Sequence, residues 1–244
     1  MSVGESVTFN GIVLSDLYTV AGVHRPMTGR TNSTQEISGY DGVRVTGSYI
    51  PSGTVTIYIL IKDMSVTERR EEMRRLTRLL HTDEPKKLSF GTDNGLYYRA
   101  ILDGMVDPNE HVRASFIQID FLVEQCILYG ETKSVTVPSG GSVQFDVDGS
   151  YKAFLKISGT VNGAGDKLLW GLRLDEGDFV RVSTGSSSGR AVTIDCEDRT
   201  ATVAGETAMI TLDSDWLELS GGKHLLRNDI GSGACTVTWQ ERWL

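Results

Sequence analysis

Short runs of alternating apolar and polar residues, separated by turns, recur through residues 131–244, and no convincing helical pattern interrupts them. Such runs are typical of antiparallel strands, because successive side chains of a strand point to opposite faces. Glycine accounts for 27 of the 244 residues, which suits the many tight turns that short strands require. We predict a β-sandwich with strands at residues 134–137, 143–147, 153–161, 167–174, 179–183, 191–196, 216–219 and 234–243.

Three local patterns refine the prediction for this half. Asn162-Gly163 is predicted to form a type I′ turn, because both residues tolerate positive φ. Residues 183–189 have no side chains suited to a core and are predicted to be a flexible connector. One face of the last strand is predicted to carry Cys235, Val237, Trp239, Glu241 and Trp243.

Residues 1–130 show strand patterns with one helix inserted, so we predict two domains, 1–130 and 131–244. The helix is predicted over about residues 65–81, where Ser65 and Glu68 form an S-x-x-E capping box. The apolar face of this helix is predicted to carry Val66, Met73, Leu76 and Leu80. A strand before the helix is indicated by alternating β-branched residues, namely Val55, Ile57, Ile59 and Ile61.

The region after the helix is predicted to return to strands. Residues 86–90 and 96–102 flank a five-residue connection that contains glycine, a pattern typical of a β-hairpin. Another strand is predicted over about 112–123. Earlier in the chain, the polar stretch 27–42 is longer than ordinary connections, so with a strand at Val43–Tyr49 it is a candidate contact loop.

Arginines on the predicted helix suggest a partner-binding surface, but glutamates lie among them at spacings that favour ion pairs. We therefore interpret this helix surface as a solvated one. The residues concerned are Arg69, Arg70, Arg74, Arg75 and Arg78, with Glu68, Glu71 and Glu72.

The charge balance argues against a nucleic-acid-binding protein. The residues before Gly130 include 13 basic and 16 acidic ones and carry −3, and those after it include 11 basic and 16 acidic ones and carry −5, which gives −8 in total. Neither half has the excess of positive charge that binding to nucleic-acid phosphates requires. No apolar window is long enough for a membrane helix, and the N-terminus has no secretion signal. We expect the protein to stay in the cytoplasm that makes it or to join an assembly built there.

No catalytic, cofactor-binding or metal site is predicted, because the common nucleotide-binding and nucleophile motifs are missing. The sequence Asp146-Val147-Asp148-Gly149 resembles the start of a calcium loop but lacks the remaining ligands, so we interpret it as a polar turn. The histidines stand far apart, at His24, His81, His111 and His224. The cysteines form no CxxC and are expected to be reduced and buried: Cys126, Cys196 and Cys235.

The tryptophans allow two interpretations. On a β-sandwich an exposed row of them would bind sugar rings, whereas alternation with Leu and Val favours packing between the sheets. We favour packing for Trp170, Trp216, Trp239 and Trp243.

Several segments, in this order, resemble the siphophage distal tail protein family. They include VTFNGIVLSDLYTVAGV, STQEISGYDGVRVTGSYIPSGTVTIYILI, TERREEMRRLTRLLHTDEPKKLSF and LYYRAILDG in the first half. In the second half they are GETK at the domain junction, VTIDCEDRTATVAGE and the terminal TVTWQERWL. The resemblance covers nearly the whole chain.

The resemblance implies a mainly β protein with a ring-forming N-terminal domain and an outward-facing, galectin-like or carbohydrate-module-like β-sandwich. It implies a hexameric ring at the tail tip, around a channel for DNA, with no catalysis and no cofactor. The implied partners are further copies of the chain, the tail tube protein, the tail-associated tip protein and a receptor-binding protein. Neither sequence-specific nucleic-acid binding nor membrane insertion is implied.

Two other classes of function remain open on the sequence. A carbohydrate-binding protein would use the C-terminal sandwich, and an intracellular enzyme would need a site that no motif identifies. The second is the weaker alternative, since the sequence offers no nucleophile, base or cofactor cradle for it.

Overall fold

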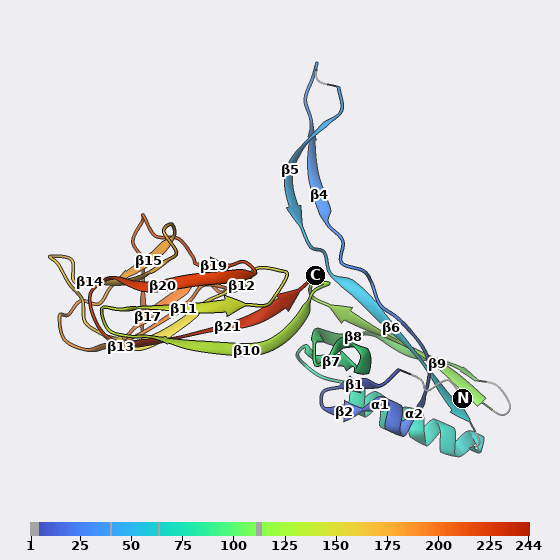
Figure 1. Cartoon of the computed structure of the whole chain (residues 1–244). Helices are drawn as coiled ribbons and strands as arrows, with labels where there is room; N and C mark the ends of the chain where they lie inside the picture. The colour runs from blue at the N-terminus through green and yellow to red at the C-terminus, as the bar shows by residue number, and fades with distance from the viewer. Residues whose placement is uncertain (1–4, 40, 63, 111–113) are drawn as a thin grey trace. The chain divides into compact units, whose positions relative to one another are not determined.

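The structure is a computed structural model that describes residues 5–39, 41–62, 64–110 and 114–244. The chain divides into two compact units, one comprising the residues up to Tyr129 together with Leu244, the other running from Gly130 to Trp243. Strands dominate both units (Figure 1), which confirms the mainly β fold class. Each unit has its own apolar core. No helix among the described residues is long and apolar enough to span a bilayer.

The first unit is built on a sheet whose strands are ordered β3–β6–β9–β8–β7–β1–β2. Its strands are β1 (Val7–Phe9), β2 (Ile12–Val13), β3 (Thr19–His24), β6 (Gly53–Lys62), β7 (Lys86–Phe90), β8 (Tyr97–Glu110) and β9 (Ala114–Val123). The helices are α1 (Leu14–Leu17) and α2 (Val66–Leu80), and a 3-10 turn spans Gly91–Asp93. A separate hairpin consists of β4 (Thr31–Glu36) and β5 (Val43–Tyr49).

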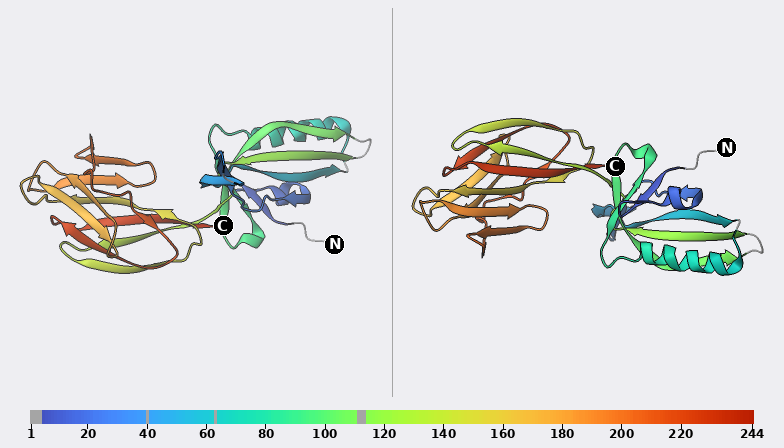
Figure 2. Two further views of the ribbon diagram at one scale, coloured as in Figure 1. Left: turned by 90° about the horizontal axis from the view of Figure 1, so that it is seen from above. Right: turned by 90° about the horizontal axis from the view of Figure 1, so that it is seen from below.

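Helix α2 begins where the sequence predicts it. The Ser65 hydroxyl accepts from the Glu68 N–H at 3.3 Å, and the Glu68 carboxylate accepts from the Ser65 N–H at 2.8 Å, so both bonds of the capping box are present. Helix α2 lies along one face of the sheet (Figure 2). Its Leu76 and Leu80 are buried in the core, whereas Val66 is 49% exposed. Val66 was wrongly expected on the apolar face, since the first helical turn precedes the part that meets the core.

Other elements of the first unit differ from the prediction in extent. The predicted hairpin is present as β7 and β8, paired from Lys86–Ala100 to Ser89–Tyr97, but β8 continues to Glu110. Helix α1 was not predicted, because a single turn is too short to show a helical period. The stretch 27–42 was wrongly expected to be a loop, since it contains β4.

The second unit is a β-sandwich, as predicted. One sheet is ordered β18–β17–β16–β13–β21–β10 and the other β11–β20–β14–β15, with a further pair β12–β19. The strands are β10 (Leu128–Val137), β11 (Ser142–Val147), β12 (Ala153–Phe154), β13 (Lys156–Val161), β14 (Leu169–Leu174), β15 (Phe179–Ser183), β16 (Arg190–Asp195), β17 (Thr200–Val203), β18 (Glu206–Ala208), β19 (Glu218–Leu219), β20 (Gly222–Ile230) and β21 (Cys235–Trp243).

Two local predictions in this unit are wrong. Asn162 and Gly163 have no positive φ, and the backbone of Asn162 instead pairs with Ser232 through bonds of 2.8 and 3.0 Å. A contact distant in sequence therefore replaces the local turn. Residues 146–147 lie within strand β11 and are not a turn.

The connector at 183–189 is fixed to the rest of the unit by hydrogen bonds. The Thr184 hydroxyl donates to the carbonyl oxygens of Leu168 and Ser186.

Candidate assembly surfaces

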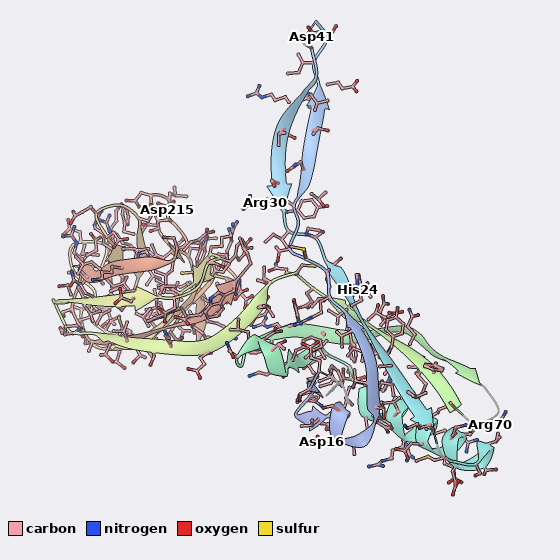
Figure 3. The ribbon with its side chains drawn as sticks, turned by 45° about the vertical axis from the view of Figure 1, so that its right-hand side comes forward. Asp16, His24, Arg30, Asp41, Arg70 and Asp215 are labelled. Carbon is pink, nitrogen blue, oxygen red and sulfur yellow. The ribbon has the colours of Figure 1, made fainter. Side chains whose placement is uncertain are left out.

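The hairpin β4–β5 is the most exposed element of the first unit. All residues of both strands are exposed, and among the described residues the two strands pair only with each other. Figure 3 labels Arg30 and Asp41, which lie at the root and near the tip of this hairpin. Its exposed apolar side chains are Val43, Val45 and Tyr49, at 51%, 57% and 58% exposure. A two-stranded hairpin that no other element covers is at best marginally stable in water. This hairpin therefore has the character of an unpartnered contact surface.

The root of the hairpin is tightly packed. The Thr28 hydroxyl donates to the Cys126 carbonyl at 2.6 Å, and the Cys126 N–H donates to the Pro51 carbonyl at 3.4 Å. Gly53 lies against the buried sulfur of Cys126, and a Cβ atom at Gly53 would overlap that sulfur and approach Pro26 Cγ at 3.1 Å. The chain therefore enters and leaves the hairpin through a site that has no room for an added methyl group.

Gly53→Ala is expected to lower the free energy of unfolding of the first unit by about 1–3 kcal/mol, because the methyl group overpacks this site. Gly29→Ala is the matched control, since nothing lies within 4 Å of the corresponding Cβ position. Calorimetry measures the change. Tryptophan fluorescence should show an unchanged transition for the second unit, which holds all 4 tryptophans. Equal stability of the two variants would contradict the prediction.

The sheet of β6, β9 and β8 has one face on the core and one face in solvent. On the solvent face, Asp103 and Asp120 are directly opposite each other on β8 and β9. The Thr56 hydroxyl donates to Asp120 Oδ1 at 2.6 Å, and the Gln118 amide donates to Oδ2 at 2.9 Å. Like charges in a cross-strand pair destabilise a sheet. Tyr58 and Phe116 are also exposed, at 42% and 48%, so this face combines acidic and aromatic side chains.

The arginines of α2 are only partly engaged in the predicted ion pairs. Arg75 binds Glu72 at 3.2 Å, but Arg69 is buried and donates to the Met64 carbonyl at 3.0 Å, so it does not lie on the solvated surface. In the described part of the chain, neither Arg74 nor Arg78 has a carboxylate within 4.0 Å. The predicted ion pairs would have neutralised most of the arginine charges on this helix. Because Arg74 and Arg78 do not form them, the helix surface is more basic than predicted.

Glu72 has a second partner in the core. The Tyr18 hydroxyl donates to its Oε1 at 2.7 Å, which ties the segment after α1 to α2. Burial raises the pKa of Tyr18, and the neighbouring Glu72 carboxylate raises it further. The pair is a structural link and not a reactive site.

A depression of about 430 Å³ lies on the first unit beside the turn between β1 and β2. Its cations rest on aromatic rings: Lys87 Nζ is 4.3 Å from the ring centroid of Tyr97, and the Arg99 guanidinium is 4.6 Å from that of Tyr129. The two tyrosine rings stack at 6.0 Å. Such contacts stabilise the position of the charges and account for this cluster structurally.

The three histidines that the structure describes are not grouped with other metal-ligating side chains. Among the described residues, no three potential metal-ligating side chains come together; His111 lies outside those residues. His24 and His81 are exposed. His224 is buried, with Nδ1 3.0 Å from Asp175 Oδ2 and Nε2 2.9 Å from the Ser220 carbonyl oxygen.

Asp175 holds the β14–β15 turn to β20. Partial burial raises its pKa, but the bonds from the Leu225 N–H and from His224 outweigh burial and hold the pKa below its ordinary value. The environment of His224 is therefore that of a structural histidine. All three cysteines are buried, and burial raises the pKa of each thiol.

The tryptophans do not form an exposed platform. Trp170 and Trp239 are 0% and 4% exposed and belong to the core of the sandwich, and Trp216 is half-buried against that core. Trp243 is also half-buried. The expectation that these side chains pack between the sheets is confirmed for Trp170 and Trp239.

Comparison with known proteins decides the family. Residues 13–123 match the family model described as phage tail protein RIFT-related domain, and residues 148–243 match the siphovirus-type tail component, C-terminal domain. The distal tail protein of Bacillus phage SPP1 is 22% identical over 223 residues, covering 88% of this chain and 87% of the relative. The chain belongs to the siphophage distal tail protein family.

A solved structure supports the same fold for this member of the distal tail protein family. The crystal structure of the SPP1 Dit protein, described as a paradigm of hub adsorption apparatus in phages that infect Gram-positive bacteria, aligns with a TM-score of 0.78. The alignment covers 98% of this chain and 99% of the other at 17% identity. The distal tail family thus accounts for both units, and its members are components of the virion tail.

Sequence reasoning proposed the region of the hairpin as a contact element and predicted β5 correctly, but it assigned β4 to a loop. It missed the opposed pair Asp103 and Asp120, because cross-strand register cannot be read from either strand alone. The only local signal was the pair of polar residues Gln118 and Asp120, which alternate with apolar residues on β9.

Proposed function

We propose that this distal tail protein forms a closed ring of six copies at the tail tip, with residues 1–130 building the ring and residues 131–244 facing outward. The observation that carries the proposal is the hairpin β4–β5, whose strands are exposed along their whole length. A ring requires a heterologous interface, in which one patch meets a different patch on the next copy. In the proposed ring, the hairpin packs on the neighbouring copy, covering Val43, Val45 and Tyr49.

The solvent face of the β6–β9–β8 sheet is the surface that we assign to the channel. Asp103 and Asp120 place two opposed carboxylates on this face, which also carries Lys62 at the end of β6 and Arg99 on β8. Acidic walls repel phosphates, so DNA would pass without being held. Two opposed carboxylates are unfavourable in a cross-strand pair, so their presence here supports a role for the charge itself.

In this proposal the protein is a structural hub without catalysis. The ring joins the tail tube protein to the tail-associated tip protein, and the second unit docks a receptor-binding protein. The chain assembles in the host cytoplasm and then resides in the virion tail. The carbohydrate-binding alternative is less favoured, because Trp170 and Trp239 are buried in the sandwich and offer no platform for a sugar.

Negative-stain electron microscopy of the purified protein tests the proposal directly. We expect rings with a central hole, and light scattering should give about six times the mass of one chain. A monodisperse single chain, both alone and with tail tube protein added, would contradict it. A ring whose lumen is lined by neutral or basic side chains would leave the ring intact but refute the channel assignment.

A further inference from the structure

Two large hydrophobic side chains of the second unit are far more exposed than the rest, and they lie close together in the sequence. Among the described residues of Gly130–Trp243, the only large hydrophobic side chains classed as exposed are Met209 and Leu212, at 89% and 107%. They are three positions apart, between β18 and β19. The neighbouring apolar residues Ile210 and Trp216 pack against the core instead. Single exposed hydrophobic residues are ordinary, but two highly exposed ones only three positions apart mark a candidate contact.

The segment that carries them is held firmly by hydrogen bonds to β15. The Thr211 N–H donates to the Arg181 carbonyl at 2.9 Å, and the Asp215 N–H donates to the Phe179 carbonyl at 2.8 Å. Between these anchors, the Ser214 N–H donates to the Thr211 carbonyl at 3.0 Å and closes a tight turn over Leu212 and Asp213.

Side-chain bonds lock the same turn. The Ser214 hydroxyl accepts from the Arg181 N–H at 2.9 Å and lies 2.7 Å from the Thr211 hydroxyl. Arg181 also binds Asp213 at 3.3 Å. The exposure of Leu212 is therefore a property of an ordered turn, and a partner that binds it does not first have to order the segment.

The charges around the turn are mostly acidic, and the exposed Lys167 also lies close enough to Asp213 to interact with it electrostatically. Asp213 and Asp215 flank Leu212 on the chain and are exposed, and Asp215 is drawn as a labelled side chain in Figure 3. The bond from Asp215 to Phe179 brings the exposed Asp178 to the same side. The nearby Arg173 and Arg181 are both engaged by Asp229. With 11 basic and 16 acidic residues after Gly130, the unit carries −5, so two such surfaces repel each other.

We propose that Met209 and Leu212 are the anchors by which the second unit docks a different protein, one that offers an apolar socket bordered by lysine or arginine. This deepens the proposed function, on which it rests, by assigning the docking surface and the chemistry of the partner. An apolar anchor inside a charged rim is the usual arrangement of a specific interface, and the acidic rim selects a basic border.

Site-specific cross-linking in phage particles that carry this chain tests the proposal. Benzoylphenylalanine replaces Leu212 in one variant and Ser187, exposed on the same unit, in a control variant. After irradiation of purified virions, mass spectrometry identifies the products. We expect position 212 to cross-link to one protein other than this chain, within a few residues of lysine or arginine. Products no more abundant than at position 187, or a cross-link to another copy of this chain, would overturn it.

A second pair of variants measures the contribution of the two anchors. In the same particles, Met209→Ser with Leu212→Ser is expected to reduce the copy number of the cross-linked protein about tenfold or more, since two apolar anchors are removed. Ser187→Ala should leave it unchanged. Unchanged copy number in the double variant would overturn the proposal. If the intact chain were absent from the virions, the proposed function as a tail component would be wrong. That outcome differs from the one that contradicts only the docking role of Met209 and Leu212, so the two proposals are tested separately.

Discussion

A chain without the hairpin β4–β5 is expected to remain a monomer under conditions in which the intact chain forms rings. Thr31 and Tyr49 are directly paired at the root, so residues 31–49 can be replaced by an Asn-Gly turn that joins the two ends with little distortion. The deletion removes exposed strands and no core residue, so both units should fold as before. Light scattering should then report about one sixth of the mass of the ring.

The design separates loss of contact from loss of fold. Calorimetry of the shortened chain should still show a cooperative unfolding transition for each unit, because neither core includes a hairpin residue. The intact chain should unfold at a higher temperature, since ring formation stabilises the folded subunit by mass action. A milder variant, Val43→Asn with Val45→Asn, keeps the hairpin and removes exposed apolar surface, so it should weaken the ring without abolishing it. Rings of unchanged mass from the shortened chain would show that the hairpin makes no essential contact.

Trp170→Ala is expected to lower the free energy of unfolding of the second unit by about 3–5 kcal/mol, a large part of the stability of a domain of this size. Trp170 is fully buried on β14, and its side chain is among the largest in the core between the two sheets. Replacement with Ala loses the buried apolar surface and leaves a cavity that the sheets cannot easily close.

The remaining tryptophans provide the measurement. All 4 tryptophans lie in the second unit, so fluorescence during urea unfolding follows that unit alone. Leu212→Ala is the control, because its side chain is fully exposed and its loss should change stability by less than about 0.5 kcal/mol. A Trp170→Ala variant as stable as this control would mean that the core is packed differently.

The sequence was most informative where the determining interactions are local. The capping box of Ser65 and Glu68 placed the start of α2 correctly, since both of its bonds lie within four residues. Strand β9 was also predicted, because its buried residues alternate regularly from Ile117 to Val123.

Where neighbours distant in sequence decide the structure, prediction failed. Strand β4 has no apolar alternation, as both of its faces are in solvent, and only its partner β5 makes it a strand. Strand β20 was not predicted. The alternation of apolar and polar residues is broken there by the consecutive Leu225 and Leu226 and by a bulge against β14. Asn162-Gly163 does not form the predicted turn, because the backbone of Asn162 pairs with that of Ser232. The register that opposes Asp103 to Asp120 likewise depends on two strands at once.

The composition of β4 also affects how newly made chains behave before they meet their partners. A strand with open hydrogen-bonding edges invites indiscriminate pairing and fibril formation in a crowded cell. The segment Thr31–Glu36 reads TNSTQE and contains no aliphatic or aromatic side chain, so copies of it that paired edge to edge would bury little apolar surface. The polar composition of β4 therefore disfavours indiscriminate pairing at this edge.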